Sequence, residues 1–137
     1  MKHCIKKDNF SISFQLNVFE SDIQYSSNTI LTVAVESDGF CADSNMDIDI
    51  KEFAAFVDTL TALFSTLKGN AIIQEPYGQK QYISFSSDNT GHVFINGKLN
   101  SNGRNGFSQE LVFENSIDQT YMPDFISSLS EFCKKYI

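Results

Sequence analysis

Four side chains that carry oxygen ligands alternate along residues 43–49: they are Asp43, Asn45, Asp47 and Asp49. Alternating acids and amides of this kind supply the first ligands of a calcium-binding loop. Such a loop also needs a glycine at its sixth position and a glutamate at its twelfth, where this chain has Ile48 and Ala54. The same alternation arises in a strand whose other face is buried. We therefore predict an exposed strand here and no bound metal.

Two further features could mark an enzyme. Gly97 and Lys98 resemble the end of a phosphate-binding loop, but that motif needs a glycine five residues earlier and Ser or Thr after the lysine. His92 and Leu99 stand at those places. His3 and His92 are the only histidines, and the chain has no G-x-S-x-G nucleophile turn. We predict an ordinary Asn-Gly turn here, no cofactor and no catalysis.

Acidic residues outnumber basic ones along the segment 36–58. Lys51 is the one basic residue of this segment. Its seven acids are Glu36, Asp38, Asp43, Asp47, Asp49, Glu52 and Asp58. Asp49 and Glu52 suit the start of a helix, where carboxylates accept hydrogen bonds from free N–H groups. The candidate partner-binding residues are Glu36, Asp38, Asp43 and Asp47. They form either an ordinary solvated strand face or a docking surface for a basic protein partner.

The composition is that of a folded, acidic protein. The 137 residues are 42% hydrophobic and 20% charged, which suits a single domain over residues 1–137. The net charge of −7 opposes binding to nucleic acid or to an anionic membrane and favours a basic partner. No apolar run reaches the roughly 20 residues that span a bilayer, and the N-terminus lacks the apolar core of a signal peptide. Three widely spaced cysteines suit a reducing compartment, so we expect free thiols and a cytoplasmic protein.

Alternating apolar residues predict the strands that carry these side chains. Before the first helix the expected strands cover residues 10–18, 29–36 and 40–50; after it they cover 70–74, 81–86, 92–95 and 107–114. The stretch 96–106, rich in glycine and asparagine, is expected to be a flexible hairpin connection, with an extension of the preceding strand through Lys98 and Leu99 as an open alternative. Strands joined by tight turns are antiparallel neighbours. The predicted fold is α+β, with one antiparallel sheet, two amphipathic helices packed on one of its faces, and the order β3-α-β4-α.

The two helices are predicted from apolar stripes. Residues 49–69 place on one helical face Phe53, Phe56, Val57, Leu60, Leu63, Phe64 and Leu67. A second helix, beginning near 120–122, repeats that spacing position for position with Met122, Phe125, Ile126, Leu129, Phe132, Cys133 and Tyr136. The match suggests two related halves, but core-facing helices in general share this spacing. Both interpretations stay open.

Three stretches resemble the WapI-type immunity proteins of bacterial polymorphic toxin systems. They are the alternating strand 10–18, the segment 91–97 (GHVFING), and Leu111-Val112-Phe113 followed by 118–122 (DQTYM), Phe125 and Leu129. The resemblance implies a small cytoplasmic protein that binds and blocks a cognate toxin, often a nuclease, and it brings no catalytic residues. The preferred function is therefore a non-catalytic immunity protein whose partner is a basic toxin domain. The alternative is a small ligand-binding or structural domain that uses the groove between sheet and helices.

Overall fold

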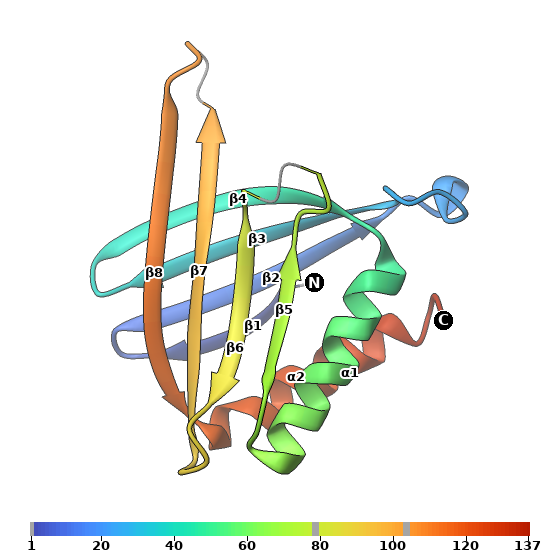
Figure 1. Cartoon of the computed structure of the whole chain (residues 1–137). Helices are drawn as coiled ribbons and strands as arrows, with labels where there is room; N and C mark the ends of the chain where they lie inside the picture. The colour runs from blue at the N-terminus through green and yellow to red at the C-terminus, as the bar shows by residue number, and fades with distance from the viewer. Residues whose placement is uncertain (1, 78–79, 103–104) are drawn as a thin grey trace.

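The computed structural model describes residues 2–77, 80–102 and 105–137, and it contains two antiparallel sheets and two helices (Figure 1). The first sheet has the order β1 (Lys2–Lys7), β2 (Phe10–Val18), β3 (Thr29–Ser37), β4 (Phe40–Ile48). The second has the order β5 (Asn70–Gln74), β6 (Tyr82–Ser87), β7 (His92–Asn102), β8 (Ser108–Asp118). Helix α1 (Ile50–Thr66) follows the first sheet and α2 (Met122–Cys133) follows the second. Two short 3-10 turns are η1 (Glu20–Asp22) and η2 (Gln119–Tyr121).

The α+β class is confirmed, but the single sheet and the order β3-α-β4-α are wrong. The strands divide into two sheets of four, and each sheet is followed by a helix. The strand that the sequence does not reveal is β1, which pairs with β2 and buries His3 and Ile5. Its sequence, KHCIKK, has a histidine and a single isoleucine on the buried face, so its apolar alternation is too short to recognise.

The expected connection at 96–106 is mostly strand, because β7 continues to Asn102 and β8 begins at Ser108. Gly97 is a strand residue rather than part of a turn. A Cβ atom at Gly97 would lie 2.5 Å from the carbonyl oxygen of Tyr82 on β6, so only glycine permits this close approach of the two strands. Gly103 and Arg104, which also belong to the expected connection, lie outside the described residues.

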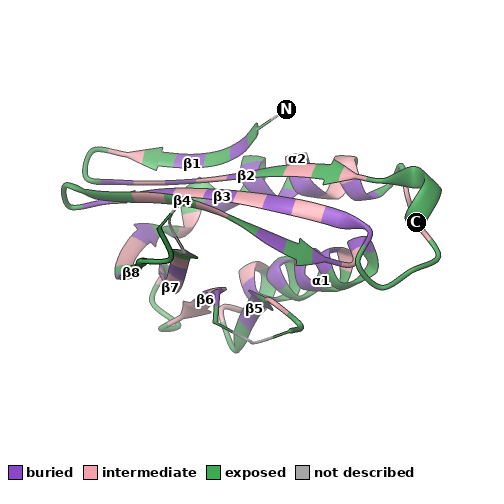
Figure 2. Ribbon diagram, turned by 90° about the horizontal axis from the view of Figure 1, so that it is seen from above, coloured by how far each residue is buried: buried purple, intermediate pink, exposed green. Residues whose placement is uncertain are grey.

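A cluster of five phenylalanines joins both sheets and both helices. It consists of Phe14 on β2, Phe53 and Phe56 on α1, Phe85 on β6, and Phe125 on α2. The ring of Phe14 lies 6.0, 6.2 and 5.6 Å from those of Phe53, Phe56 and Phe125, and Phe85 lies 5.9 Å from Phe56. Figure 2 shows the first sheet lying over the helices and the second sheet, with buried residues recurring along its strands. Core side chains therefore fill the space between the sheets and the helices.

The two apolar stripes are confirmed as core faces. Within α1 the buried members are Phe53, Phe56, Val57, Leu60 and Leu63, and within α2 they are Met122, Phe125, Ile126, Leu129 and Cys133. Helix α1 packs beside β5 and α2 packs beside β1, so each helix lies against the first strand of the other half (Figure 1). An aspartate precedes each helix at the same distance from its stripe, and Asp49 and Asp118 accept hydrogen bonds from the N–H groups of Lys51 and Thr120. This arrangement favours the interpretation of two related halves.

Replacing Leu60 by alanine is expected to lower the free energy of unfolding by about 2–5 kcal/mol, because the side chain is fully buried at the centre of the α1 stripe. The measurement is a urea titration of both proteins. A loss below about 1 kcal/mol would contradict the placement of Leu60 in a close-packed core, where truncation leaves a cavity.

Candidate partner-binding site

The strand register places three of the four predicted acids on the solvent face of the first sheet. Glu36 on β3 lies opposite Cys41 of β4, so it is a diagonal neighbour of Asp43. Asp47 lies on the same face, four residues further along β4 and about 13 Å from Asp43. All three are exposed, and none forms a salt bridge within the described residues. Their negative charge is therefore available to a partner.

Asp38, the fourth predicted acid, lies in the turn between β3 and β4 and is held in place by neighbours. Its carboxylate accepts hydrogen bonds from the side-chain amides of Asn9 (2.8 Å) and Asn115 (3.3 Å). Its φ of 49° is left-handed, a conformation that aspartate tolerates better than most residues. Asp38 thus links the β1–β2 turn and β8 to this turn. The fold brings Glu36, Asp38 and Asp43 to one end of the sheet and leaves Asp47 apart from them.

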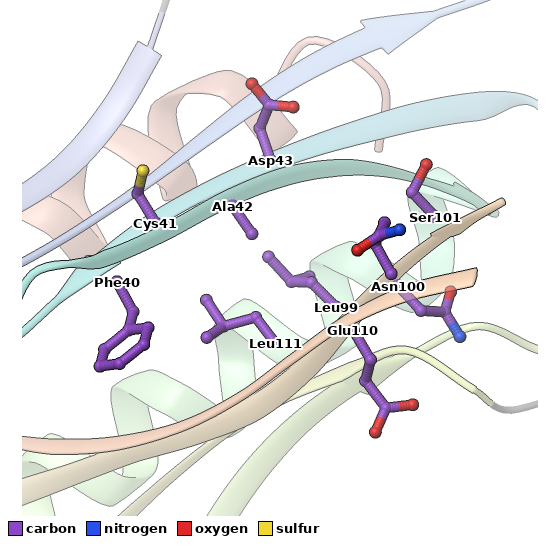
Figure 3. Close-up of a pocket in the computed structure, with 10 residues that line it drawn as sticks. Phe40, Cys41, Ala42, Asp43, Leu99, Asn100, Ser101, Glu110 and Leu111 are labelled. Carbon is purple, nitrogen blue, oxygen red and sulfur yellow. The ribbon is translucent and has the colours of Figure 1, made fainter. Parts of the chain in front are cut away.

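A groove of about 290 Å³ opens between the start of β4, the end of β7 and the start of β8 (Figure 3). We call it the β4–β8 groove; residues 40–43, 99–101 and 109–111 line it. Ala42, Leu99 and Leu111 point toward one another and form an apolar floor, whereas Asp43 points to the opposite side of β4 (Figure 3). Glu110 lies at the other rim. The groove therefore has an apolar centre, and the acids of its bordering strands, Asp43 and Glu110, point away from its floor.

A second groove, of about 460 Å³, adjoins the first and follows β8. We call it the edge groove; Ser37, Asp38, Phe40 and residues 110–114 line it. Phe40 belongs to both grooves and its side chain is 69% exposed. A large, exposed aromatic residue beside half-buried Leu111 is the kind of group that anchors protein interfaces.

Sequence reasoning assigned Phe40 to a strand but did not identify it as part of a site. Phe40 has the same parity along β4 as Met46 and Ile48, which are fully buried, so alternation alone suggests a core position. The fold exposes it because β4 is the edge strand of the first sheet. At the same level of the register Phe10 on β2 is buried against Phe113, whereas Phe40 lies at the outer edge. Only the packing of one sheet against the other reveals this.

The walls of the β4–β8 groove are joined by a buried glutamine. The side-chain amide of Gln81 donates to the carbonyl oxygen of Asn45 on β4 (2.9 Å), and its carbonyl accepts from the N–H of Asn100 on β7 (3.1 Å). The hydroxyl of Ser44 donates to the carbonyl oxygen of Asn100 (2.9 Å). Satisfied buried polar groups hold their elements in one arrangement. The groove is therefore a fixed feature of the fold.

The described residues offer little catalytic or metal chemistry. Residues 2–77, 80–102 and 105–137 contain no group of three or more His, Cys, Asp or Glu side chains placed to hold a metal ion. Within these residues, two hydroxyl–imidazole contacts resemble a nucleophile with its base. One joins Oγ1 of Thr90 and Nδ1 of His92 (3.1 Å) at the exposed turn between β6 and β7, and the other joins Oγ of Ser128 and Nδ1 of His3. The His3 side chain is only 2% exposed and packs edge-on against Phe132. The pair of His3 and Ser128 therefore links β1 to α2 instead of facing a substrate.

The His3 site predicts a pH-dependent stability. Burial, together with the nearby charge of Lys135, holds the pKa of His3 below its ordinary value of 6.5. The unfolded chain then binds a proton at His3 that the folded chain does not, so stability should fall as the pH drops below about 6.5. We expect a smaller loss between about pH 7.5 and pH 5.5 in His3→Gln than in the unmodified protein, measured by urea titration. Equal losses in the two proteins would contradict this role.

Comparison with known proteins assigns the chain to a family. A search of curated proteins finds no match to it. Within the described part of the chain, no helix is both long enough and apolar enough to cross a membrane. The model of the immunity protein WapI-like family matches residues 4–136, which include both helices, both grooves and all of the two sheets except the first two residues of β1. The chain therefore belongs to the WapI-like family of immunity proteins.

Proposed function

We propose that this protein is a non-catalytic inhibitor that binds a basic toxin domain through the β4–β8 groove and blocks it. The observation that carries the proposal is the exposed Phe40 beside an apolar floor, with Asp38 next to it in the edge groove. Glu36 and Asp43 lie close by, on the solvent face of the same two strands. Interfaces typically place an aromatic anchor at a desolvated centre and charged groups at the rim. Membership of an immunity protein family supports a toxin as the partner.

A nuclease is the kind of toxin that this surface fits best. A nuclease must be positively charged where it holds the phosphates of its substrate. An acidic surface is attracted to such a site and can cover it without imitating the nucleic acid in detail. The net charge of −7 adds a long-range attraction that would speed the encounter. In this proposal Asp47 contributes to that attraction from the far end of β4.

The compartment and the gene context are part of the same proposal. Cys4 and Cys41 are exposed thiols, Cys133 is a buried one, and none of the three is in a disulfide. Free thiols on the surface suit the reducing cytoplasm. We expect the gene to lie beside a large toxin gene with a variable C-terminal module, which would be the partner. The alternative is a ligand site between sheet and helices. The five phenylalanines fill most of that space and leave a pocket of about 170 Å³ between the end of β4, the start of α1 and the end of β5.

The test neutralises the exposed acids and measures association. The variant Glu36→Gln, Asp43→Asn, Asp47→Asn should associate with the toxin module about tenfold more slowly at low salt, with a smaller difference at high salt. Asp38 is left unchanged because its hydrogen bonds hold the turn. Stability should change by no more than about 0.5 kcal/mol per substitution, since the three side chains are exposed. Stopped-flow kinetics at two ionic strengths and a melting curve provide the measurements.

A matched control separates local from overall charge. The variant Asp22→Asn, Asp58→Asn, Glu131→Gln removes the same three charges from exposed positions on η1, α1 and α2. It should slow association much less than the first variant does. Equal slowing in both variants would show that net charge alone matters, and would place the interface elsewhere. No slowing in either would remove the electrostatic part of the proposal.

A further inference from the structure

The four edge strands of the two sheets differ in how far they are protected. Among them β1 is six residues long and carries Lys2, Lys6 and Lys7, and β5 is five residues long and packs beside α1. The edge of β4 is joined to the second sheet through Gln81 and Ser44. Short length, lysines and covering elements are the usual means of protecting an edge from further pairing. The remaining edge strand, β8, is eleven residues long and pairs with β7 on one side.

The edge groove gives access to the free side of β8. Five successive residues, 110–114, line this groove. Because successive residues of a strand point to opposite faces, a groove lined by all five follows the edge of the strand and not one of its faces. Within the described residues, no backbone hydrogen bond joins this edge to another segment between Ser108 and Ile117. Its outward N–H and C=O groups are thus available to an added strand.

The side chains along this edge specify what could pair with it. Glu110, Val112 and Glu114 alternate on the outer face of β8, and Val112 is 65% exposed. Glu110 lies 3.5 Å from Lys98, so a basic group is already attracted to it. In neighbouring strands, opposite charges and apolar side chains pair favourably across the sheet. A strand that complements β8 therefore has an apolar residue opposite Val112 and basic residues opposite Glu110 and Glu114.

We propose that an extended segment of the basic toxin adds to the free edge of β8 as a ninth strand, with its basic residues beside Glu110 and Glu114. Main-chain hydrogen bonds give such a complex its affinity, and the alternating side chains give it specificity. Phe40 would then lie beneath the added strand, because it lines the edge groove together with residues 110–114 of β8. The inference rests on the proposed function, because it names how the same partner binds.

A second copy of this chain fits the edge less well than a basic toxin. If two copies paired along β8 with Val112 opposite Val112, Glu110 of one would face Glu114 of the other. Like charges placed opposite each other destabilise a strand pair. The net charge of −7 on each copy opposes their approach as well. Charge complementarity therefore selects a basic partner for this edge.

Hydrogen exchange on the complete chain, alone and with the catalytically inactivated toxin module, tests the proposal. In the complex, outward amides of β8 should exchange at least about 100-fold more slowly than in the free chain, while amides at the free edge of β1 stay unchanged. The variant Glu110→Lys, Glu114→Lys should weaken binding by about tenfold or more. The control Asp22→Lys, Glu131→Lys, with the same charge change at exposed positions, should weaken it less.

The outcomes distinguish the two proposals. If the complex forms but β8 amides exchange as fast as in the free chain, strand addition is wrong and the proposed function stands. Protection of β8 in the free chain that rises with protein concentration would identify a second copy as the occupant and overturn the proposal. If no complex forms at all, the proposed function itself fails.

Discussion

The variant Phe14→Ala is expected to lose about 3–5 kcal/mol of unfolding free energy, a large part of the total stability of a domain of this size. Phe14 is fully buried, and its ring contacts Phe53, Phe56 and Phe125. The substitution opens a cavity where the first sheet meets both helices. It also removes three aromatic contacts, each worth about 0.5–1.5 kcal/mol beyond the buried area.

A urea titration of the unmodified protein and the variant gives the measurement for Phe14. Ile72→Ala is the matched control, because Ile72 lies on the outer face of β5 and is 45% exposed. The control should change stability by less than about 1 kcal/mol. A similar small change for Phe14→Ala would mean that the phenylalanine cluster does not hold the two halves together.

The largest expected effect on binding is that of Phe40→Ala, which should weaken the toxin complex by about 2–4 kcal/mol through faster dissociation. Phe40 is the exposed aromatic residue shared by the β4–β8 groove and the edge groove. In a complex the ring of Phe40 would be removed from water and packed against the partner, whereas charged groups at the rim of an interface stay exposed to water. The free protein should keep its stability within about 0.5 kcal/mol, because the ring is mostly exposed before binding.

Surface plasmon resonance with the immobilised toxin module, beside a melting curve, measures this effect. Tyr25→Ala removes a similarly exposed aromatic ring from the loop between η1 and β3 and provides the control. We expect an unchanged dissociation rate for the control. Equal dissociation rates for Phe40→Ala and the unmodified protein would exclude the two grooves as the centre of the interface.

Much of the fold follows from alternation and helical spacing. The strand predicted over residues 10–18 is β2, and five of the seven apolar residues of the first predicted stripe are buried on α1. These elements are recognisable because each buries one face against the core, which forces apolar residues into a fixed period. The predicted cap Asp49 is found as well, since a helix start needs acceptors for its free N–H groups.

Features that depend on contacts between distant segments could not be predicted. Buried Asn28 accepts a hydrogen bond from the N–H of Ile50 and donates to Asp49, and Gln81 joins the two sheets. A single polar residue that forms a hydrogen bond with a distant backbone group produces no repeating pattern in the sequence. The division into two sheets depends on where α1 directs the chain after β4. It decides which strands become edges, and so it also determines where the grooves lie.

Only part of the candidate site could be predicted, because the rest depends on contacts between distant segments. Asp43 and Asp47 share a face because they stand an even number of residues apart on one strand, which the sequence does predict. Glu36 joins them through the register of β3 against β4. Phe40 and Val112, which come from different sheets, meet at the edge groove only after the two sheets pack together. Charge was therefore visible in the sequence, whereas the apolar centre of the site was not.

The most direct test of the proposed function is a titration of toxin activity with this protein. The purified C-terminal module of the neighbouring toxin is held at a fixed concentration, and its activity on its own substrate is measured as the protein is added. We predict that activity falls to the background level at one equivalent of protein, because an occluding inhibitor covers one active site per toxin. Full toxin activity in the presence of a large excess of correctly folded protein would contradict the account.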